Sequence, residues 1–119
     1  MILTGSCAAP FGPKAVRSTM GACFRLPLWR GERQAVKELL SRSGIPLYAT
    51  ALREDTEDIR GVDLSQAAVV IGSEGRGISE ELLGLCERSL KIPMSERCES
   101  LNAAIAAAVV LWEGYQKAD

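Results

Sequence analysis

At 119 residues the chain is long enough for one domain that buries roughly two-thirds of the surface of its unfolded form. Its hydrophobic fraction of 47%, charged fraction of 24% and net charge of −1 are those of an ordinary soluble globular protein. No apolar run approaches the roughly 20 residues needed to cross a bilayer, and residues 1–14 lack the pattern of a signal peptide, so we expect a cytoplasmic protein without a membrane segment.

Hydrophobic periodicity and turn residues predict strands that alternate with helices. The first expected strand covers residues 1–5 and begins at the first residue, as if the domain had been cut within a strand. In chain order, the other expected elements are a helix over 14–22, a strand over 23–29, a helix over 32–42, strands over 45–52 and 66–71, a helix over 79–87, a strand over 90–92 and a helix over 99–115. This alternation indicates an α/β fold with a mainly parallel sheet and flanking helices.

Particular residues set the expected boundaries. Gly21 is expected to end the helix over 14–22, and Gly44 follows the helix over 32–42 at the position where glycine commonly ends a helix. Ser79 is a good N-cap for the helix over 79–87. The acidic, poorly periodic residues 53–65 are expected to form a surface loop, long enough to act as a lid. The strand over 66–71 is expected to be buried.

Cysteine and histidine content limits the possible chemistry. Four widely spaced cysteines contain no CxxC pair, so we expect free thiols in a reducing compartment. They are Cys7, Cys23, Cys86 and Cys98. The chain has no histidine, which disfavours a zinc site and excludes Ser-His and Cys-His nucleophiles. We therefore expect no metal cofactor.

The near-neutral net charge conceals an uneven distribution. Residues 1–53 carry eight Lys/Arg against two acids, whereas residues 54–119 carry six against thirteen. A basic half beside an acidic half is consistent with a face that binds a polyanion. Two solvated surfaces of opposite charge bias would explain the pattern equally well.

Two loops follow strands and precede helices, one with the sequence GSEGRG from Gly72 and one through residues 92–94. Such loops meet at the carboxyl edge of parallel strands, where open sheets bind ligands. The glycine spacing matches neither GxGxxG nor Walker A, and Glu74 would repel a phosphate. A cradle for an uncharged or zwitterionic adenosyl group suits the loop better, with a ligand-free turn as the alternative.

The second loop and the helix after it also have simpler explanations. Residues 92–94 could be a strand end stiffened by proline, with Met94 in the core. Ser100 and Asn102 could be polar groups of a helix N-terminus, or Asn102 could reach across a cleft. The alanine-rich helix could be a closely packed core helix or the seam of a dimer.

Four segments at this spacing closely resemble one protein family. VVIGSEGRGIS (69–79), LKIPM (90–94) and ESLNAAIAAAVVLWE (99–113) resemble the second and third motifs of the SpoU family, the SPOUT-class RNA 2′-O-ribose methyltransferases. KAVRSTMGACFRLPL (14–28) resembles the segment between that family's first and second motifs, with Thr19 where serine is usual. The resemblance covers residues 1–119 as one N-terminally truncated domain.

The resemblance implies an α/β fold with a C-terminal trefoil knot, a rare exception to the rule that chains do not thread loops. It also implies S-adenosylmethionine bound in the knot, RNA as a partner, and a homodimer formed partly through the last helix. The implied reaction is attack of a ribose 2′-hydroxyl on the sulfonium methyl, which requires positioning and removal of the hydroxyl proton but no metal.

The residues that match the family's motifs receive roles by position. Backbone contacts to the cofactor are implied for Gly72, Ile92 and Leu101, and pocket-shaping roles for Gly77, Met94 and Ser100. Thr50 and Ala51 are placed near the adenosyl group, Glu74 and Asn102 are the catalytic candidates, and Lys14 and Arg17 are placed toward the RNA.

One departure from the family's pattern leaves the activity open. The family's first motif, NxGxxxR, supplies the arginine usually credited with catalysis, and it does not occur in this sequence. The resemblance is therefore compatible with an rRNA or tRNA 2′-O-ribose methyltransferase or with a non-catalytic, dimerising adenosyl-binding or RNA-binding remnant. An unrelated nucleotide-binding α/β domain is a third hypothesis.

Overall fold

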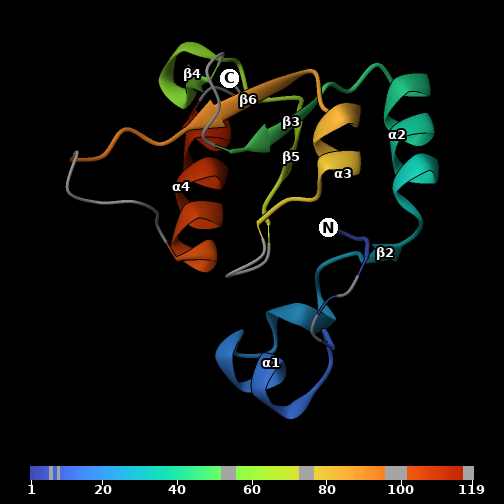
Figure 1. Ribbon diagram of the computed structural model, residues 1–119. Helices are drawn as coiled ribbons and strands as arrows, with labels where there is room; N and C mark the ends of the chain where they lie inside the picture. The colour runs from blue at the N-terminus through green and yellow to red at the C-terminus, as the bar shows by residue number, and fades with distance from the viewer. Residues whose placement is uncertain (6, 8, 52–55, 73–76, 96–101, 117–119) are drawn as a thin grey trace. The chain divides into compact units, whose positions relative to one another are not determined.

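Two compact units make up the chain, Met1–Val36 and Lys37–Asp119. The computed structural model describes residues 1–119 apart from 6, 8, 52–55, 73–76, 96–101 and 117–119 (Figure 1). Each unit has its own strand pairing, so each is described by itself below.

The first unit is a small α/β element. Its parts are β1 (Ile2–Leu3), α1 (Pro13–Ser18), the 3₁₀ turn η1 (Ala22–Phe24) and β2 (Trp29–Arg30). β1 and β2 pair in parallel, with Ile2 opposite Trp29. α1 begins with Pro13, whose fixed φ and missing N–H suit the first helical position.

The strand expected over residues 23–29 is wrong for most of its length, and the helix expected over 14–22 is shorter. Gly21 and Met20 both have positive φ, of 81° and 52°, and they turn the chain after α1. The Gly21 amide donates to the Val16 carbonyl at 3.3 Å, which closes the helix. The chain then continues as η1, and its pairing with β1 begins at Trp29.

Helix α2 (Arg33–Arg42) confirms the helix expected over 32–42. Gly44 has a φ of 69° and donates to the Ser41 carbonyl at 3.2 Å, while Ile45 donates to the Leu40 carbonyl at 2.9 Å. These two hydrogen bonds satisfy carbonyls that the end of a helix leaves unpaired. The expected helix-ending role of Gly44 is therefore confirmed.

A four-stranded, all-parallel sheet forms the centre of the second unit (Figure 1). Its strands, in the spatial order β4-β6-β3-β5, are β4 (Glu57–Asp58), β6 (Arg88–Lys91), β3 (Leu47–Thr50) and β5 (Ala68–Val70). β3 lies between two partners, with Ala49 opposite Val70 and Thr50 opposite Leu90. Helices α3 (Glu80–Leu85) and α4 (Ala103–Gln116) complete the unit. The expected α/β fold with a mainly parallel sheet is confirmed.

The surface loop and lid expected over residues 53–65 are wrong for the residues after 55. Ile59, Val62 and Leu64 are only 2%, 4% and 6% exposed, and they pack in one cluster with Tyr48, Leu90 and Val110. The segment also contains β4 and the 3₁₀ turn η2 (Ile59–Gly61). The acidic residues of this segment led to the expectation of a surface loop. The three apolar side chains are buried instead, because removing them from water is favourable.

Charged side chains of this segment stabilise the turn from outside the core. Asp58 accepts from the Arg60 backbone amide at 2.9 Å and pairs with the Arg60 guanidinium at 2.7 Å. This pairing lowers the pKa of Asp58 from 3.8 to about 2. Because the folded pKa is lowered, the contribution to stability is present above the unfolded pKa and is lost as the pH falls toward the folded value.

The remaining elements differ from expectation mainly in their bounds. β5 is half-buried rather than buried, since it lies at one edge of the sheet. β6 begins at Arg88, earlier than expected, and α3 ends at Leu85 rather than at residue 87. The described part of the last helix begins at Ala103. No helix within the described residues combines the length and apolar character needed to cross a membrane.

Substitution of Ile59 tests whether this segment belongs to the core. Ile59→Ala should lower the free energy of unfolding by roughly 2–5 kcal/mol, and Ile59→Val by roughly 0.5–1.5 kcal/mol, because both leave a cavity beside Leu90. Urea denaturation measures both values. Leu39→Ala, at a side chain that is 37% exposed, is the control and should cost less. A loss below about 0.5 kcal/mol for Ile59→Ala, as for a surface residue, would contradict the assignment.

Candidate functional site

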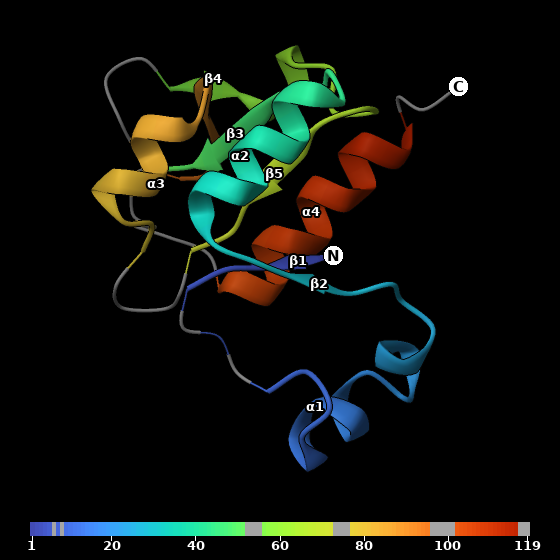
Figure 2. The ribbon, with the colours of Figure 1, turned by 90° about the vertical axis from the view of Figure 1, so that its right-hand side faces the viewer.

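Three chain segments leave the sheet at its carboxyl edge, one after each of three neighbouring strands (Figure 2). β3 ends at Thr50 and is followed by Ala51, Gly72 lies two residues after β5, and residues 92–94 follow β6. Because the strands are parallel and paired, their ends meet along one side. The prediction that the two loops share a sheet edge is therefore confirmed, and β3 adds a third segment between them.

Gly72 and Gly77 are the first and last residues of the glycine loop, and their backbones are in close contact. A Cβ atom built on Gly72 would lie 2.6 Å from the carbonyl carbon of Gly77 and 2.9 Å from Cγ1 of Ile78. Only glycine fits at 72, because backbone cannot move aside as a flexible side-chain tip can. Gly77 has a φ of 64° and open space around its Cα. The contact between residues 72 and 77 thus requires glycine at position 72 whether or not a ligand is present. This structural requirement was not predicted from the sequence.

Two threonine hydroxyls hold the backbone at this edge. The Thr50 hydroxyl donates to the Val70 carbonyl at 2.8 Å and so joins the end of β3 to the end of β5. The Thr56 hydroxyl donates to the Ala51 carbonyl at 3.1 Å. Thr56 was missed by the sequence analysis, and no sequence signal marks it, because its partner is a backbone carbonyl five residues away.

Asn102 caps the last helix. Its side-chain Oδ1 accepts from the Ala104 amide at 2.9 Å, and its carbonyl accepts from the Ala106 amide at 2.9 Å. This is the arrangement of an N-cap residue, in which a side-chain oxygen satisfies one of the unpaired amides of the first turn. The helix-capping alternative is confirmed for Asn102, and the carboxamide oxygen is engaged within its own helix.

The other candidate residues are placed as follows. Ile92 is half-buried and Met94 is 36% exposed, so the segment after β6 presents apolar surface at the sheet edge. Lys14 and Arg17 lie exposed on α1 in the first unit, with Arg17 Nε donating to the Pro13 carbonyl at 3.3 Å. Glu74, Ser100 and Leu101 lie outside the described residues.

The segments that leave the edge are uncharged over their described residues. The residues that directly follow β3, β5 and β6 (Ala51, Ile71, Gly72 and residues 92–94) carry no charged side chain, whereas Lys91, the last residue of β6, is charged and exposed. Backbone groups, the Thr50 hydroxyl and apolar side chains therefore dominate what a ligand would meet there. Such a lining suits an adenosyl group.

Thiols and potential metal ligands complete the inventory of reactive groups. Cys7, Cys23 and Cys86 are free, and Cys86 Sγ donates to the Leu82 carbonyl at 3.3 Å. Burial raises the pKa of the Cys86 thiol, partly opposed by the charge of Lys37, which makes this thiol a poor nucleophile. Within the described part of the chain, no three Cys, Asp or Glu side chains are grouped as a metal site would require.

Comparison with known proteins assigns the chain to a family. The model of the SpoU rRNA Methylase family matches residues 1–112. A tRNA (guanosine(18)-2′-O)-methyltransferase of Thermus thermophilus is 47% identical over 79 residues, which cover 66% of this chain and 41% of the relative. The 23S rRNA (guanosine(2553)-2′-O)-methyltransferase RlmP of Bacillus subtilis is 30% identical over 112 residues, covering 94% of this chain and 45% of the relative.

A solved structure agrees with both relatives. The AdoMet-bound rRNA methyltransferase from Sinorhizobium meliloti superposes with a TM-score of 0.87 at 32% identity, covering 97% of this chain and 44% of that one. The chain thus spans less than half the length of these relatives. Sequence and fold lead to the same conclusion: this chain belongs to the SpoU rRNA methylase family.

Proposed function

We propose that this chain forms the cofactor-binding part of an S-adenosylmethionine-dependent RNA 2′-O-ribose methyltransferase that acts on rRNA or tRNA. The observation that carries the proposal is the meeting of three strand ends at one sheet edge, where residues of both recognised motifs lie. Membership of the SpoU family supports the reaction type. The family match crosses the boundary between the two compact units, which supports one functional domain over residues 1–119.

The sheet edge fits S-adenosylmethionine. The described residues that follow β3, β5 and β6 are uncharged and match an adenosyl group, and the close contact of Gly72 with the Gly77 backbone holds the two ends of the glycine loop together. Backbone groups of Gly72, Ile92 and Leu101 would hold the cofactor, with Gly77, Met94 and Ser100 around it and Thr50-Ala51 beside the adenosyl group. When bound, the cofactor supplies an electrophilic methyl group on a sulfonium. The relative from Sinorhizobium meliloti was solved with AdoMet bound.

The chain's own residues would position the ribose hydroxyl and take up its proton. Glu74 is a carboxylate in the glycine loop and is the candidate proton acceptor. Asn102 uses its Oδ1 to cap α4, so its contribution to the reaction would come through orientation of the helix start and through its amide nitrogen. Without histidine in the chain, a carboxylate is the natural proton acceptor among its side chains.

A non-catalytic adenosyl-binding or RNA-binding module is the second candidate. The comparisons favour the enzyme over this candidate, because the family model and the relatives are RNA methyltransferases. This candidate shares the fold and the cofactor site and differs only in turnover.

A homodimer through α4 is part of the proposal. Only Val110 of this helix is buried within the chain, while Ile105, Leu111, Trp112 and Tyr115 are 54–75% exposed. Ile105, Trp112 and Tyr115 recur at spacings of seven and three residues and lie on one face of the helix, and Leu111, four residues before Tyr115, widens that face. The Trp112 and Tyr115 rings stack at 6.0 Å. Such an exposed apolar stripe is typical of a protein interface.

Two further features of the family are proposed for this chain. A C-terminal trefoil knot is implied by membership of the SpoU family. A cytoplasmic location is supported by relatives that modify tRNA and rRNA.

Methyl transfer with variants of Asn102 separates the enzyme from the non-catalytic module. The protein should transfer labelled methyl from S-adenosylmethionine to bulk tRNA or rRNA, with 2′-O-methylnucleosides as the product detected by mass spectrometry. Asn102→Ala should reduce turnover more than stability, because loss of an N-cap costs only about 1 kcal/mol. Asn102→Asp keeps the capping oxygen but loses the amide donor, so it should match the parent in stability and still lose turnover. Absence of transfer at high protein concentration would leave the non-catalytic module.

Substitution of Gly72 tests the cofactor site directly. Gly72→Ala should abolish the rise in melting temperature that S-adenosylhomocysteine gives, because the added Cβ meets the Gly77 carbonyl group and opens the loop. Gly84→Ala is the matched control, since Gly84 lies in α3 with open space around it and alanine favours a helix. A full ligand-induced shift in Gly72→Ala would refute the site. Greater stabilisation by a dinucleotide than by S-adenosylhomocysteine would indicate an unrelated nucleotide-binding domain.

A charge placed on α4 tests the dimer. The 12.8-kDa chain should sediment at twice its mass, and Leu111→Glu should shift it to the monomer, because a carboxylate in an apolar interface loses its hydration. Gln116→Glu, at an exposed polar position near the end of the same helix, should leave the dimer intact. A parent protein that sediments as a monomer at every concentration would contradict the interface.

A further inference from the structure

The first unit exposes aromatic side chains that its own fold does not cover. Phe11 and Phe24 are 54% and 67% exposed. Their rings stack on each other with centroids 5.6 Å apart and planes only 10° from parallel. At this separation the parallel rings are offset and overlap only in part, so the pair presents a broad apolar platform at the surface.

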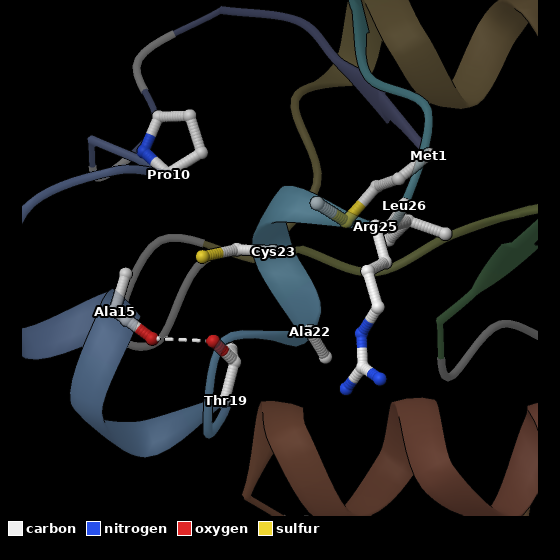
Figure 3. Close-up of a pocket in the computed structure, with 8 residues that line it drawn as sticks. All are labelled: Met1, Pro10, Ala15, Thr19, Ala22, Cys23, Arg25 and Leu26. Atoms are coloured by element: carbon white, nitrogen blue, oxygen red, sulfur yellow. Dashed lines mark hydrogen bonds between the residues drawn. The ribbon is translucent and has the colours of Figure 1, made fainter.

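The fold of the unit brings these two rings together. Phe11 lies just before α1, and Phe24 ends η1, so the turn through Met20 and Gly21 returns the chain to its starting side. The Thr19 hydroxyl donates to the Ala15 carbonyl at 2.8 Å and extends the helix end (Figure 3). An open, mostly apolar hollow of about 520 Å³ lies between the same two segments, lined by Ala15, Thr19, Ala22 and Cys23 among others.

Exposed basic residues lie close to Phe11 and Phe24 in the chain. Lys14 follows Phe11 by three residues, Arg25 is adjacent to Phe24, and Arg17 lies between them in α1. All three side chains are exposed, and the first 31 residues contain no Asp or Glu. A surface that combines flat apolar rings with cations suits nucleic acid, because bases stack on the rings and phosphates pair with the cations. A purely apolar protein partner would leave the cations without a role.

We propose that Phe11 and Phe24 form a stacking platform for an unpaired base of the RNA, with Lys14, Arg17 and Arg25 contacting the adjoining phosphates. This inference rests on the proposed function, which supplies RNA as the partner, and it specifies the kind of RNA. A duplex hides the faces of its bases, whereas a loop or single strand presents them. The platform therefore selects unpaired RNA with little preference for sequence, since every base has a π-face.

Fluorescence anisotropy with two RNA probes tests the platform. A labelled short oligouridylate represents unpaired RNA, and a blunt RNA duplex of the same length is the comparison. Phe24→Ala should weaken binding of the oligouridylate by roughly 5- to 150-fold, the effect expected for one lost base stack. Binding of the duplex should not change. Phe24→Trp should restore binding because it keeps an aromatic face.

Two sets of variants serve as controls. Met20→Ala removes a side chain of the same unit that is 90% exposed but not aromatic, and it should leave both affinities unchanged. Lys14→Glu and Arg17→Glu should weaken both probes and flatten the dependence of affinity on salt, because phosphate contacts release counterions. Phe24→Ala should leave that salt dependence as it is in the parent.

Several outcomes would overturn the platform. One is an unchanged affinity of Phe24→Ala for oligouridylate, and another is an equal loss in Met20→Ala. A changed sedimentation mass or a large drop in melting temperature for Phe24→Ala would show instead that protein covers this surface. If Phe24→Ala keeps the RNA affinity of the parent and the parent transfers methyl groups, the stacking platform is refuted while the proposed function stands. If the parent binds neither RNA, the proposed function fails with it.

Discussion

Parallel pairing of β3 with β5 on one side and β6 on the other is the constraint on which the second unit depends. It brings together the ends of three segments that lie about 20 residues apart in the chain. None of these strands exceeds four residues, so the ladder alone supplies few hydrogen bonds. Packing of Ile59, Val62 and Leu64 against Tyr48 and Leu90 provides the rest of the cohesion. The order of the strands in the sheet thus places the candidate site residues next to one another.

Local patterns predicted the elements that depend on local causes. The alternation of strands and helices, the end of α2 at Gly44 and the capping of α3 by Ser79 follow from hydrophobic period and from backbone groups that neighbouring residues satisfy. Two expectations failed because nonlocal burial decides them. Residues 57–64 carry three acids and lack a clear hydrophobic period, yet Ile59, Val62 and Leu64 are buried in the core. Residues 23–28 alternate like a strand, but the turn at Met20 and Gly21 directs them into a 3₁₀ turn, and strand partners are available only from Trp29.

Much of the candidate site was predictable as a set of segments but not as a set of contacts. Motif spacing identified the loops after β5 and β6, and parallel topology then implied that they meet. Motif spacing could not show that the Gly77 backbone leaves no room for a side chain at position 72. It also could not show that the Asn102 side-chain oxygen accepts a hydrogen bond from the Ala104 amide. At both positions one residue serves the fold and is also a candidate for the ligand. Substitution at either position is therefore expected to disturb both the local backbone structure and ligand binding, and a sequence pattern alone cannot distinguish these two effects.

The hydroxyl tethers of Thr50 and Thr56 have a consequence for how the sheet edge responds to its surroundings. Both groups donate to backbone carbonyls, and neither a hydroxyl nor a carbonyl gains or loses a proton across the physiological range. Thr50 and Val70, which end β3 and β5, are uncharged, whereas Lys91, which ends β6, is charged and exposed. The two tethers therefore keep their hydrogen bonds as the acidity varies. Sensitivity to acidity enters instead through groups such as Asp58 at the end of β4, and sensitivity to ionic strength through exposed charges such as Lys91.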